Sequence, residues 1–94
     1  MEPFSIEGLR RHMMIQRDKR VQTAVRNIYD EIQKAADQEL SELIVRIVPK
    51  EYWHVMLNTI RLDKDIADEV MAQLQPLLGD IRSTKIEQTI HFEW

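Results

Sequence analysis

The sequence of residues 85–94 is KIEQTIHFEW, in which apolar and polar side chains alternate. The positions on the apolar parity are Ile86, Gln88, Ile90, Phe92 and Trp94, of which only Gln88 is polar. Alternation with a period of two is typical of a β-strand that buries one face. We therefore expect one strand over 85–94, with its apolar face turned to a core and its end at the last residue.

The length and the composition predict one small folded domain. The chain has 94 residues, of which 44% are hydrophobic, and it contains only two glycines and three prolines. A chain of this length forms one core, and this composition is typical of an ordered protein. We expect a single domain over 1–94, in which 1–17 form a basic N-terminal arm or helix extension and 18–94 form the core.

Three further features restrict the class of protein. The longest apolar run, 43–48, is interrupted by Arg46 and is far shorter than the ~20 residues of a membrane-spanning helix. Glu2 and Glu7 surround a short apolar stretch, unlike the basic start of a secretion signal. The absence of cysteine excludes disulfides, thiolate metal ligands and thiol nucleophiles. We expect a cytoplasmic protein that does not bind membranes.

The charge is distributed unevenly along the chain. Residues 1–26 carry six basic and three acidic side chains, a charge of +3, so the total of -3 leaves -6 for the remainder. A basic segment can contact nucleic-acid phosphates, or it can dock on an acidic face of a protein partner or of a second copy. The candidate contact residues for either partner are Arg10, Arg11, Arg17, Lys19, Arg20 and Arg26.

The first long segment has the period of an amphipathic helix. Apolar residues recur at steps of three and four from Val21 to Ala36, and charged residues occupy the other faces. Apolar character continues upstream through 13–15, so we place the helix start anywhere from Ile6 to Arg17. A helix of twenty residues or more exceeds what a small sheet needs, and we expect part of it to serve another subunit.

The middle of the chain changes period. Residues 43–48 are apolar on both parities apart from Arg46, which predicts a buried strand that Pro49 ends. The segment 50–61 has apolar residues at helical spacing, but alternate positions would also suit a strand. We favour a helix there.

A better-marked helix is predicted over 63–78. Asp63 can cap its start, and acidic residues occupy its first turns, where the helix dipole favours negative charge. Pro76 must kink or tighten the last turn, and Gly79 is suited to a left-handed conformation after the helix. A mostly polar turn then leads to the closing strand.

This order of helix, strand, helix, helix, strand predicts an α+β fold in two layers. Two antiparallel middle helices would return the last strand antiparallel to the first, whereas one continuous helix would make the strands parallel. We expect a two-stranded antiparallel sheet covered by the three amphipathic helices. Such a sheet has open edges, so the closing strand is a candidate interface edge through Ile86, Gln88, Ile90, Phe92 and Trp94.

Three phrases of the sequence carry a resemblance to known proteins. They are IYDEIQKAADQE at 28–39, LQPLLGDI at 74–81 and QTIHFEW at 88–94. Over about residues 27–94 the chain resembles small uncharacterised α/β proteins encoded by large DNA viruses and bacteriophages. It departs from them at Asp37 and Gln38, where those proteins usually have a glycine after the alanine pair. The resemblance implies a viral accessory or virion protein, in the host cytoplasm or the virion, and implies no functional residues.

The sequence predicts no catalytic, metal-binding or cofactor-binding residues. His91 and Glu93 share one face of the last strand, but a zinc site needs three or four protein ligands. The acidic residues after Asp63 lack the pattern of a calcium loop and are explained by the start of a helix. The serines have no nucleophile elbow, and the two isolated glycines form no phosphate-binding loop. We therefore expect a protein that is not an enzyme.

Two hypotheses for the function remain. The first is a non-enzymatic protein-interaction or assembly module, a homo-oligomer formed through the N-terminal helix or an open sheet edge. The second is a small nucleic-acid-binding protein that uses the basic segment 10–26, for which the acidic remainder of the chain is unfavourable. The sequence indicates no small-molecule substrate for either.

Overall fold

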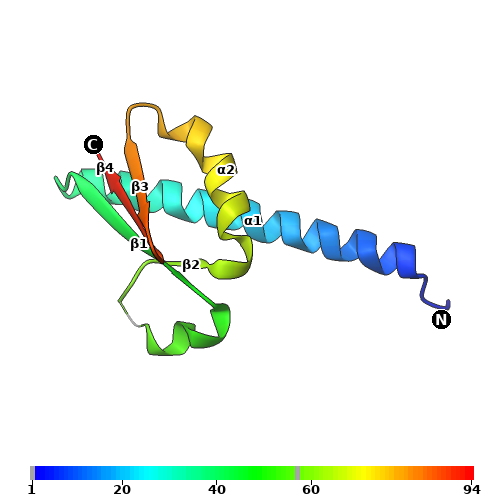
Figure 1. Cartoon of the computed structure of the whole chain (residues 1–94). Helices are drawn as coiled ribbons and strands as arrows, with labels where there is room; N and C mark the ends of the chain where they lie inside the picture. Colours follow the sequence, from blue (N-terminus) through cyan, green and yellow to red (C-terminus); the bar gives the residue numbers. More distant parts are fainter. Residues whose placement is uncertain (1, 57) are drawn as a thin grey trace.

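The computed structural model describes residues 2–56 and 58–94, and within these ranges it has two α-helices, two 3₁₀-helices and four strands (Figure 1). In chain order they are α1 (Ile6–Asp37), β1 (Glu42–Val48), the 3₁₀-helix η1 (Lys50–Val55), β2 (Arg61–Asp63), the 3₁₀-helix η2 (Lys64–Ile66), α2 (Ala67–Leu78), β3 (Arg82–Ile86) and β4 (Thr89–Glu93). The predicted α+β class is confirmed.

The sheet has four strands in the order β2-β1-β4-β3, so the prediction of a two-stranded sheet is wrong. The antiparallel pairing of the first and last strands is present, with Val45 opposite Ile90. The two additional strands lie at the edges. β2 pairs parallel to β1, and β3 pairs antiparallel to β4.

The stretch predicted as one strand over 85–94 is divided between β3 and β4. The chain reverses after Ile86, where Glu87 adopts a positive φ of 54°. The backbone carbonyl of Gln88 then accepts a hydrogen bond of 2.7 Å from the N–H of Ile47. The one polar exception in the alternating pattern is therefore part of a hairpin turn.

The hairpin also corrects the predicted interface edge. β4 pairs with β1 on one side and β3 on the other, so Ile90 and Phe92 lie on an interior strand. Of the five predicted edge residues only Ile86 belongs to a strand at the edge, β3. Strand addition at β4 is excluded because both of its edges are paired.

The segment 50–61, for which we favoured a helix, contains η1 and the first residue of β2, and Leu57 lies outside the described residues. The indole N–H of Trp53 donates to the carbonyl of Val48 at 3.0 Å. The guanidinium of Arg61 donates to the carbonyls of Trp53 and Met56 at 2.7 and 3.1 Å. These side-chain bonds hold a short connection that lets β2 run parallel to β1.

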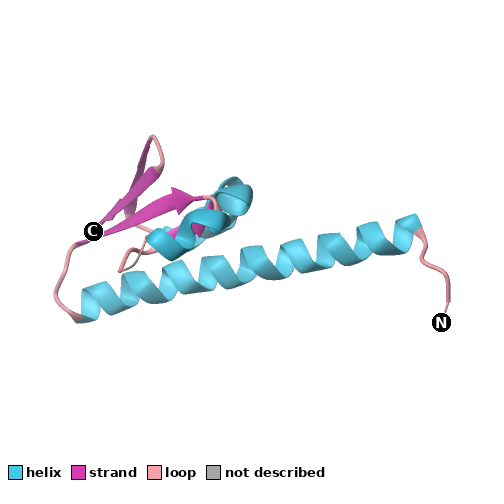
Figure 2. Ribbon diagram, turned by 90° about the horizontal axis from the view of Figure 1, so that it is seen from below, coloured by secondary structure: helices cyan, strands magenta, loops and turns pink. Residues whose placement is uncertain are grey.

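Both α-helices cover the same face of the sheet, and Figure 2 shows α1 running along it. The core joins side chains from every layer, with Val21, Ile28 and Ile32 from α1, Val70 and Leu74 from α2, and Val45, Ile47, Ile90 and Phe92 from the sheet. The inward parity of β4 is buried, whereas its outward residues Thr89, His91 and Glu93 are only half-buried.

The start of α2 differs in detail from the prediction. The carboxylate of Asp63 accepts from the N–H of Asp65 at 3.1 Å, so it caps η2 and not α2 itself. Gly79 ends α2 with the expected positive φ of 58°, and its ψ of -117° lies outside the left-handed helical region. Pro76 lies inside the last turn of α2.

Candidate interaction surface

The first half of α1 extends beyond the rest of the molecule (Figure 1). Residues 2–16 are all exposed, and the first buried residue of the helix is Val21. The molecule measures 55 × 31 × 24 Å, and its radius of gyration is 15.8 Å. A compact chain of this length has a radius of gyration of about 12 Å. We call residues 4–16 the arm.

The arm exposes large apolar side chains. Phe4, Ile6 and Met13 are 87%, 69% and 68% exposed. Ile6 and Met13, with Leu9 between them, follow helical steps of three and four, while Ile15 lies on another face. Ser5 caps the start of the helix, because its hydroxyl oxygen accepts a hydrogen bond from the N–H of Gly8 at 3.0 Å. The arm is therefore an apolar and basic helix that its own domain leaves uncovered.

A cluster of ion pairs fixes the point where the arm leaves the domain. The guanidinium of Arg17 donates to the Glu69 carboxylate at 2.9 Å and to the Asp65 carboxylate at 3.1 Å. It also donates to the backbone carbonyl of Asp65 at 2.9 Å. Arg20 pairs with Asp65 at 3.1 Å and with Asp63 at 3.5 Å. Two arginines on successive turns of α1 are thus bonded to carboxylates of residues 63–69, the segment that leads from β2 through η2 into α2.

The ion pairs change the acidity of Arg17. Its hydrogen bond to Glu69 raises the pKa of the guanidinium above the ordinary value; desolvation opposes the rise, and the charges of Glu69 and Asp65 add to it. Arg17 therefore stays charged throughout the neutral range.

The six predicted contact residues have different environments. Arg17 and Arg20 are occupied by carboxylates, and Arg26 lies 3.9 Å from Asp30. Arg10, Arg11 and Lys19 are exposed and make no ion pair with any residue in the described ranges. The structure does not gather the six cations into one free patch.

Sequence reasoning missed the acidic partners of these arginines. Asp65 and Glu69 were explained as residues that favour the start of a helix, which they also are. Their contacts span 48 and 52 residues of sequence, and no local pattern reports such a distance. The only sign of these partners in the sequence was the net charge of -6 on residues 27–94, which shows an excess of carboxylates but not which of them face the arginines.

An apolar hollow lies at the other end of α1, beside α2. Its volume is about 340 Å³, and it is lined by Tyr29, Ile32, Gln33, Ala36, Leu77, Leu78, Ile81 and Trp94. Tyr29, Leu77 and Trp94 are 47%, 54% and 39% exposed. Trp94, predicted as a core residue, is thus part of a partly exposed apolar surface.

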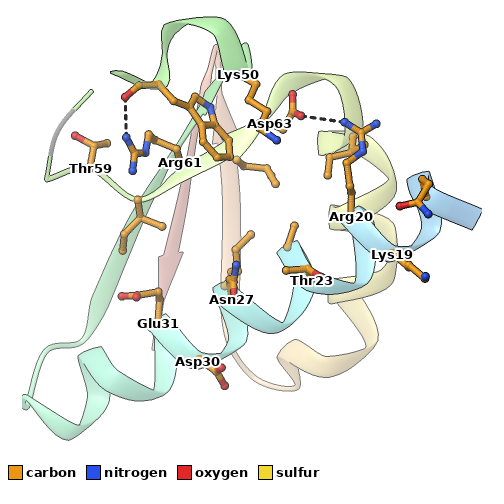
Figure 3. Close-up of a pocket in the computed structure, with 17 residues that line it drawn as sticks. Lys19, Arg20, Thr23, Asn27, Asp30, Glu31, Lys50, Thr59, Arg61 and Asp63 are labelled. Carbon is orange, nitrogen blue, oxygen red and sulfur yellow. Dashed lines mark hydrogen bonds and ion pairs between the residues drawn. The ribbon is translucent and has the colours of Figure 1, made fainter. Parts of the chain in front are cut away.

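A larger groove of about 710 Å³ lies between α1 and the segment from η1 to β2 (Figure 3). Its lining mixes basic and acidic side chains, among them Lys19, Lys50, Asp30, Glu31 and Asp63. Arg20 and Arg61 also line it, but their bonds to Asp63 and to the Trp53 carbonyl occupy them, as the dashed lines show. With both signs of charge present, the groove defines no single class of ligand.

His91 lies between two carboxylates on the outward face of the sheet. Its Nε2 is 2.9 Å from Glu42, and its Nδ1 is 3.0 Å from Glu93. Residues 2–56 and 58–94 contain no group of three or more His, Asp or Glu side chains that could hold a metal ion. The imidazole of His91 thus links Glu42 of β1 to Glu93 of its own strand, β4.

Comparison with family models, with curated proteins and with solved structures finds no match to this chain. The resemblance of residues 27–94 to small viral and bacteriophage proteins therefore stays a prediction. Within the described residues, each helix is too short or too polar to cross a bilayer.

Proposed function

We propose that the protein is a non-enzymatic interaction module that self-associates through the arm. The observation that carries the proposal is the row of exposed apolar side chains on a helix that projects from the domain. Exposed apolar surface of this kind usually marks a binding site for another macromolecule.

The instability of short helices supports the same proposal. The helical part of the arm, residues 6–16, has eleven residues, and isolated helices shorter than about 12–15 residues are only marginally stable in water. Its one fixed end is the ion-pair cluster of Arg17 and Arg20. Burial of Leu9, Met13 and Ile15 against a partner would supply the stabilisation that tertiary packing gives the rest of α1.

The nucleic-acid alternative is less well supported by the same geometry. Phosphate binding requires free cations, and Asp65 and Glu69 offset the charges of Arg17 and Arg20. Of the six candidate contact residues, only Arg10, Arg11 and Lys19 are exposed and make no ion pair with a residue in the described part of the chain. We therefore place a second copy, and not a nucleic acid, on the arm.

Light scattering coupled to size-exclusion chromatography, over a dilution series, tests the proposal. The unaltered protein should be a dimer or higher oligomer that dissociates on dilution. A variant with Leu9→Glu, Met13→Glu and Ile15→Glu should be a monomer, because it places charges on the apolar faces of the arm.

Two matched variants complete the experiment. Tyr52→Glu with Val55→Glu alters exposed apolar residues of η1 and should leave the oligomer intact. Ile86→Lys tests association through the free edge of β3. A monomeric unaltered protein, or an oligomer lost with Ile86→Lys and kept without the apolar arm residues, would overturn the proposal. Salt-sensitive binding to DNA at low ionic strength by a monomer would favour the alternative.

A further inference from the structure

We infer that two copies pair their α1 helices antiparallel, so that the arm of each copy docks in the groove of the other. The groove is the one between α1 and the segment from η1 to β2 (Figure 3). This inference rests on the proposed self-association and specifies its geometry. It commits to a second copy of this chain as the occupant of the groove.

One row of positions on α1 joins the arm to the groove. The exposed Ile6, Leu9 and Met13 of the arm follow steps of three and four. The same alternating steps continue into four residues that line the groove: Gln16, Arg20, Thr23 and Asn27. Positions at such steps keep to one side of a helix. The apolar row of the arm and the groove therefore lie on the same side of α1, so a two-fold antiparallel pair brings the row of each copy to the groove of the other.

The groove holds apolar side chains that its own domain leaves partly uncovered. Ala24 of α1, Trp53 of η1 and Ile60, which precedes β2, line the groove and are half-buried. Docking of Leu9 and Met13 from the second copy would remove apolar surface of both partners from water, which stabilises the pair. An amphipathic helix that lies in an apolar groove is a recurring mode of protein recognition.

The unpaired charges specify the direction of pairing. Arg17 and Arg20 add no free charge, because carboxylates of their own chain offset them. Arg10 of the arm is exposed, Glu31 lines the groove and is half-buried, and neither makes an ion pair with any residue in the described ranges. An antiparallel pair brings Arg10 of each copy to Glu31 of the other. A parallel pair would bring the two copies of Arg10 together, which is unfavourable.

The contact between Arg10 and Glu31 also specifies the register. Each lies four residues after a position of the row, Ile6 or Asn27, so the two side chains share one flank of α1. Flanking residues of this kind form the ion pairs between paired helices. Placing Arg10 opposite Glu31 puts the two-fold axis between residues 20 and 21. Met13 of one copy then lies beside Asn27 of the other.

The centre of the pair carries Arg20 from both copies. Each Arg20 lies 3.1 Å from Asp65 and 3.5 Å from Asp63 of its own chain, so the two guanidinium groups meet with their charges offset. A pair formed by the arms alone would instead bring the two copies of Arg10 together with no carboxylate to offset them. The charges therefore favour docking in the groove over a pair of arms.

Disulfide cross-linking tests this geometry directly, because the chain contains no cysteine. Under mild oxidation a mixture of the Met13→Cys and Asn27→Cys proteins should give the mixed disulfide, because the two positions face each other across the pair. Met13→Cys mixed with Gln22→Cys is the matched control and should give much less, since Gln22 is exposed but lies about 140° around the helix from Asn27. Self-linking of Met13→Cys alone would show a parallel pair and would overturn the inference.

Charge reversal provides a second measurement. Arg10→Glu and Glu31→Arg should each weaken the dimer by about tenfold, because each change turns two symmetric attractions into repulsions. The protein with both changes should recover most of the original affinity. Arg11→Glu is the matched control, since Arg11 is exposed on another face of α1, and it should leave the affinity nearly unchanged.

The two measurements separate this geometry from self-association itself. A dimer that forms no mixed disulfide, and that Arg10→Glu and Arg11→Glu weaken equally, would overturn docking in the groove while leaving self-association in place. A monomer at all concentrations would overturn both.

Discussion

Arg17 of α1 and Glu69 of α2 are joined by a side-chain hydrogen bond of 2.9 Å across 52 residues of sequence. This contact, with the bonds of Arg17 to Asp65, lies where the exposed arm meets the first buried turn of α1. The first helix is therefore tied to the domain at its middle. The contact separates the half of α1 that packs against the core from the half that is exposed.

Arg17→Ala should loosen the arm more than it destabilises the domain. Amide hydrogen exchange should accelerate over residues 6–20 and change little in the core strands, because the substitution removes the tether and no buried apolar group. Arg10→Ala is the control, since Arg10 is exposed and has no ion pair with a described residue. Equal exchange in the two variants would contradict the tethering role of Arg17.

The same tether should be insensitive to pH in the neutral range. The folded pKa of Arg17 is raised above the unfolded value. Its contribution to stability is therefore fully present below the unfolded pKa and is lost only as the pH rises through the folded pKa. We expect the exchange rates of residues 6–20, corrected for intrinsic chemistry, to stay constant between about pH 6 and 9. A loss of protection within that window would indicate that another group controls the arm.

Asp63→Ala should lower the free energy of unfolding by about 1 to 2 kcal/mol. Asp63 is 8% exposed, and its carboxylate accepts a hydrogen bond from the N–H of Asp65, so its removal leaves that donor without its cap. Asp63→Asn keeps an acceptor oxygen and should cost less. Urea unfolding measures both, with the exposed Asp80→Ala as the control. Equal losses for the Ala and Asn variants would show that charge and not capping matters at this position.

Phe92→Ala should be the more damaging of two aromatic substitutions near the end of the chain. Phe92 is fully buried on the interior strand β4, and its removal should cost about 3 to 5 kcal/mol. Trp94 retains 39% exposure, so Trp94→Ala should cost less in a monomer. Thermal melting at low protein concentration compares the two. A greater loss for Trp94→Ala would indicate that its exposed face is covered by a partner.

The helical part of the fold could be predicted from local signals. The steps of three and four in 21–36 reflect the buried stripe that includes Val21, Ile28 and Ile32. The expectation of a basic N-terminal arm or helix extension over 1–17 came from charge, and it stays a prediction. Periodicity reports which face a helix buries, so the buried stripe follows from the chain alone.

The edge strands could not be predicted because their residues lack that periodicity. β2 has only three residues, and its parallel pairing with β1 depends on tertiary contacts of Trp53 and Arg61. β3 is mostly polar and exposed, so it shows no apolar alternation. The apolar hollow is likewise invisible in sequence, since it forms only where α1, α2, Ile81 and Trp94 meet.

The hairpin turn was missed for a different reason, which leads to a prediction. Two-residue turns usually have glycine or asparagine where φ is positive, and here Glu87 occupies that position. A left-handed conformation costs a residue with a side chain roughly 1 to 2 kcal/mol. Replacement by glycine removes this strain but adds about 0.5 to 1 kcal/mol of backbone entropy to be lost on folding.

Glu87→Gly should therefore stabilise the protein by up to about 1 kcal/mol. Glu87→Asn should also stabilise it, because asparagine tolerates the left-handed region. Glu87→Ala is the control that keeps the strain and should bring no gain. Urea unfolding midpoints of the three variants measure these changes. An equal gain with alanine and with glycine would show that the destabilisation comes from the glutamate side chain and not from the backbone conformation at this position.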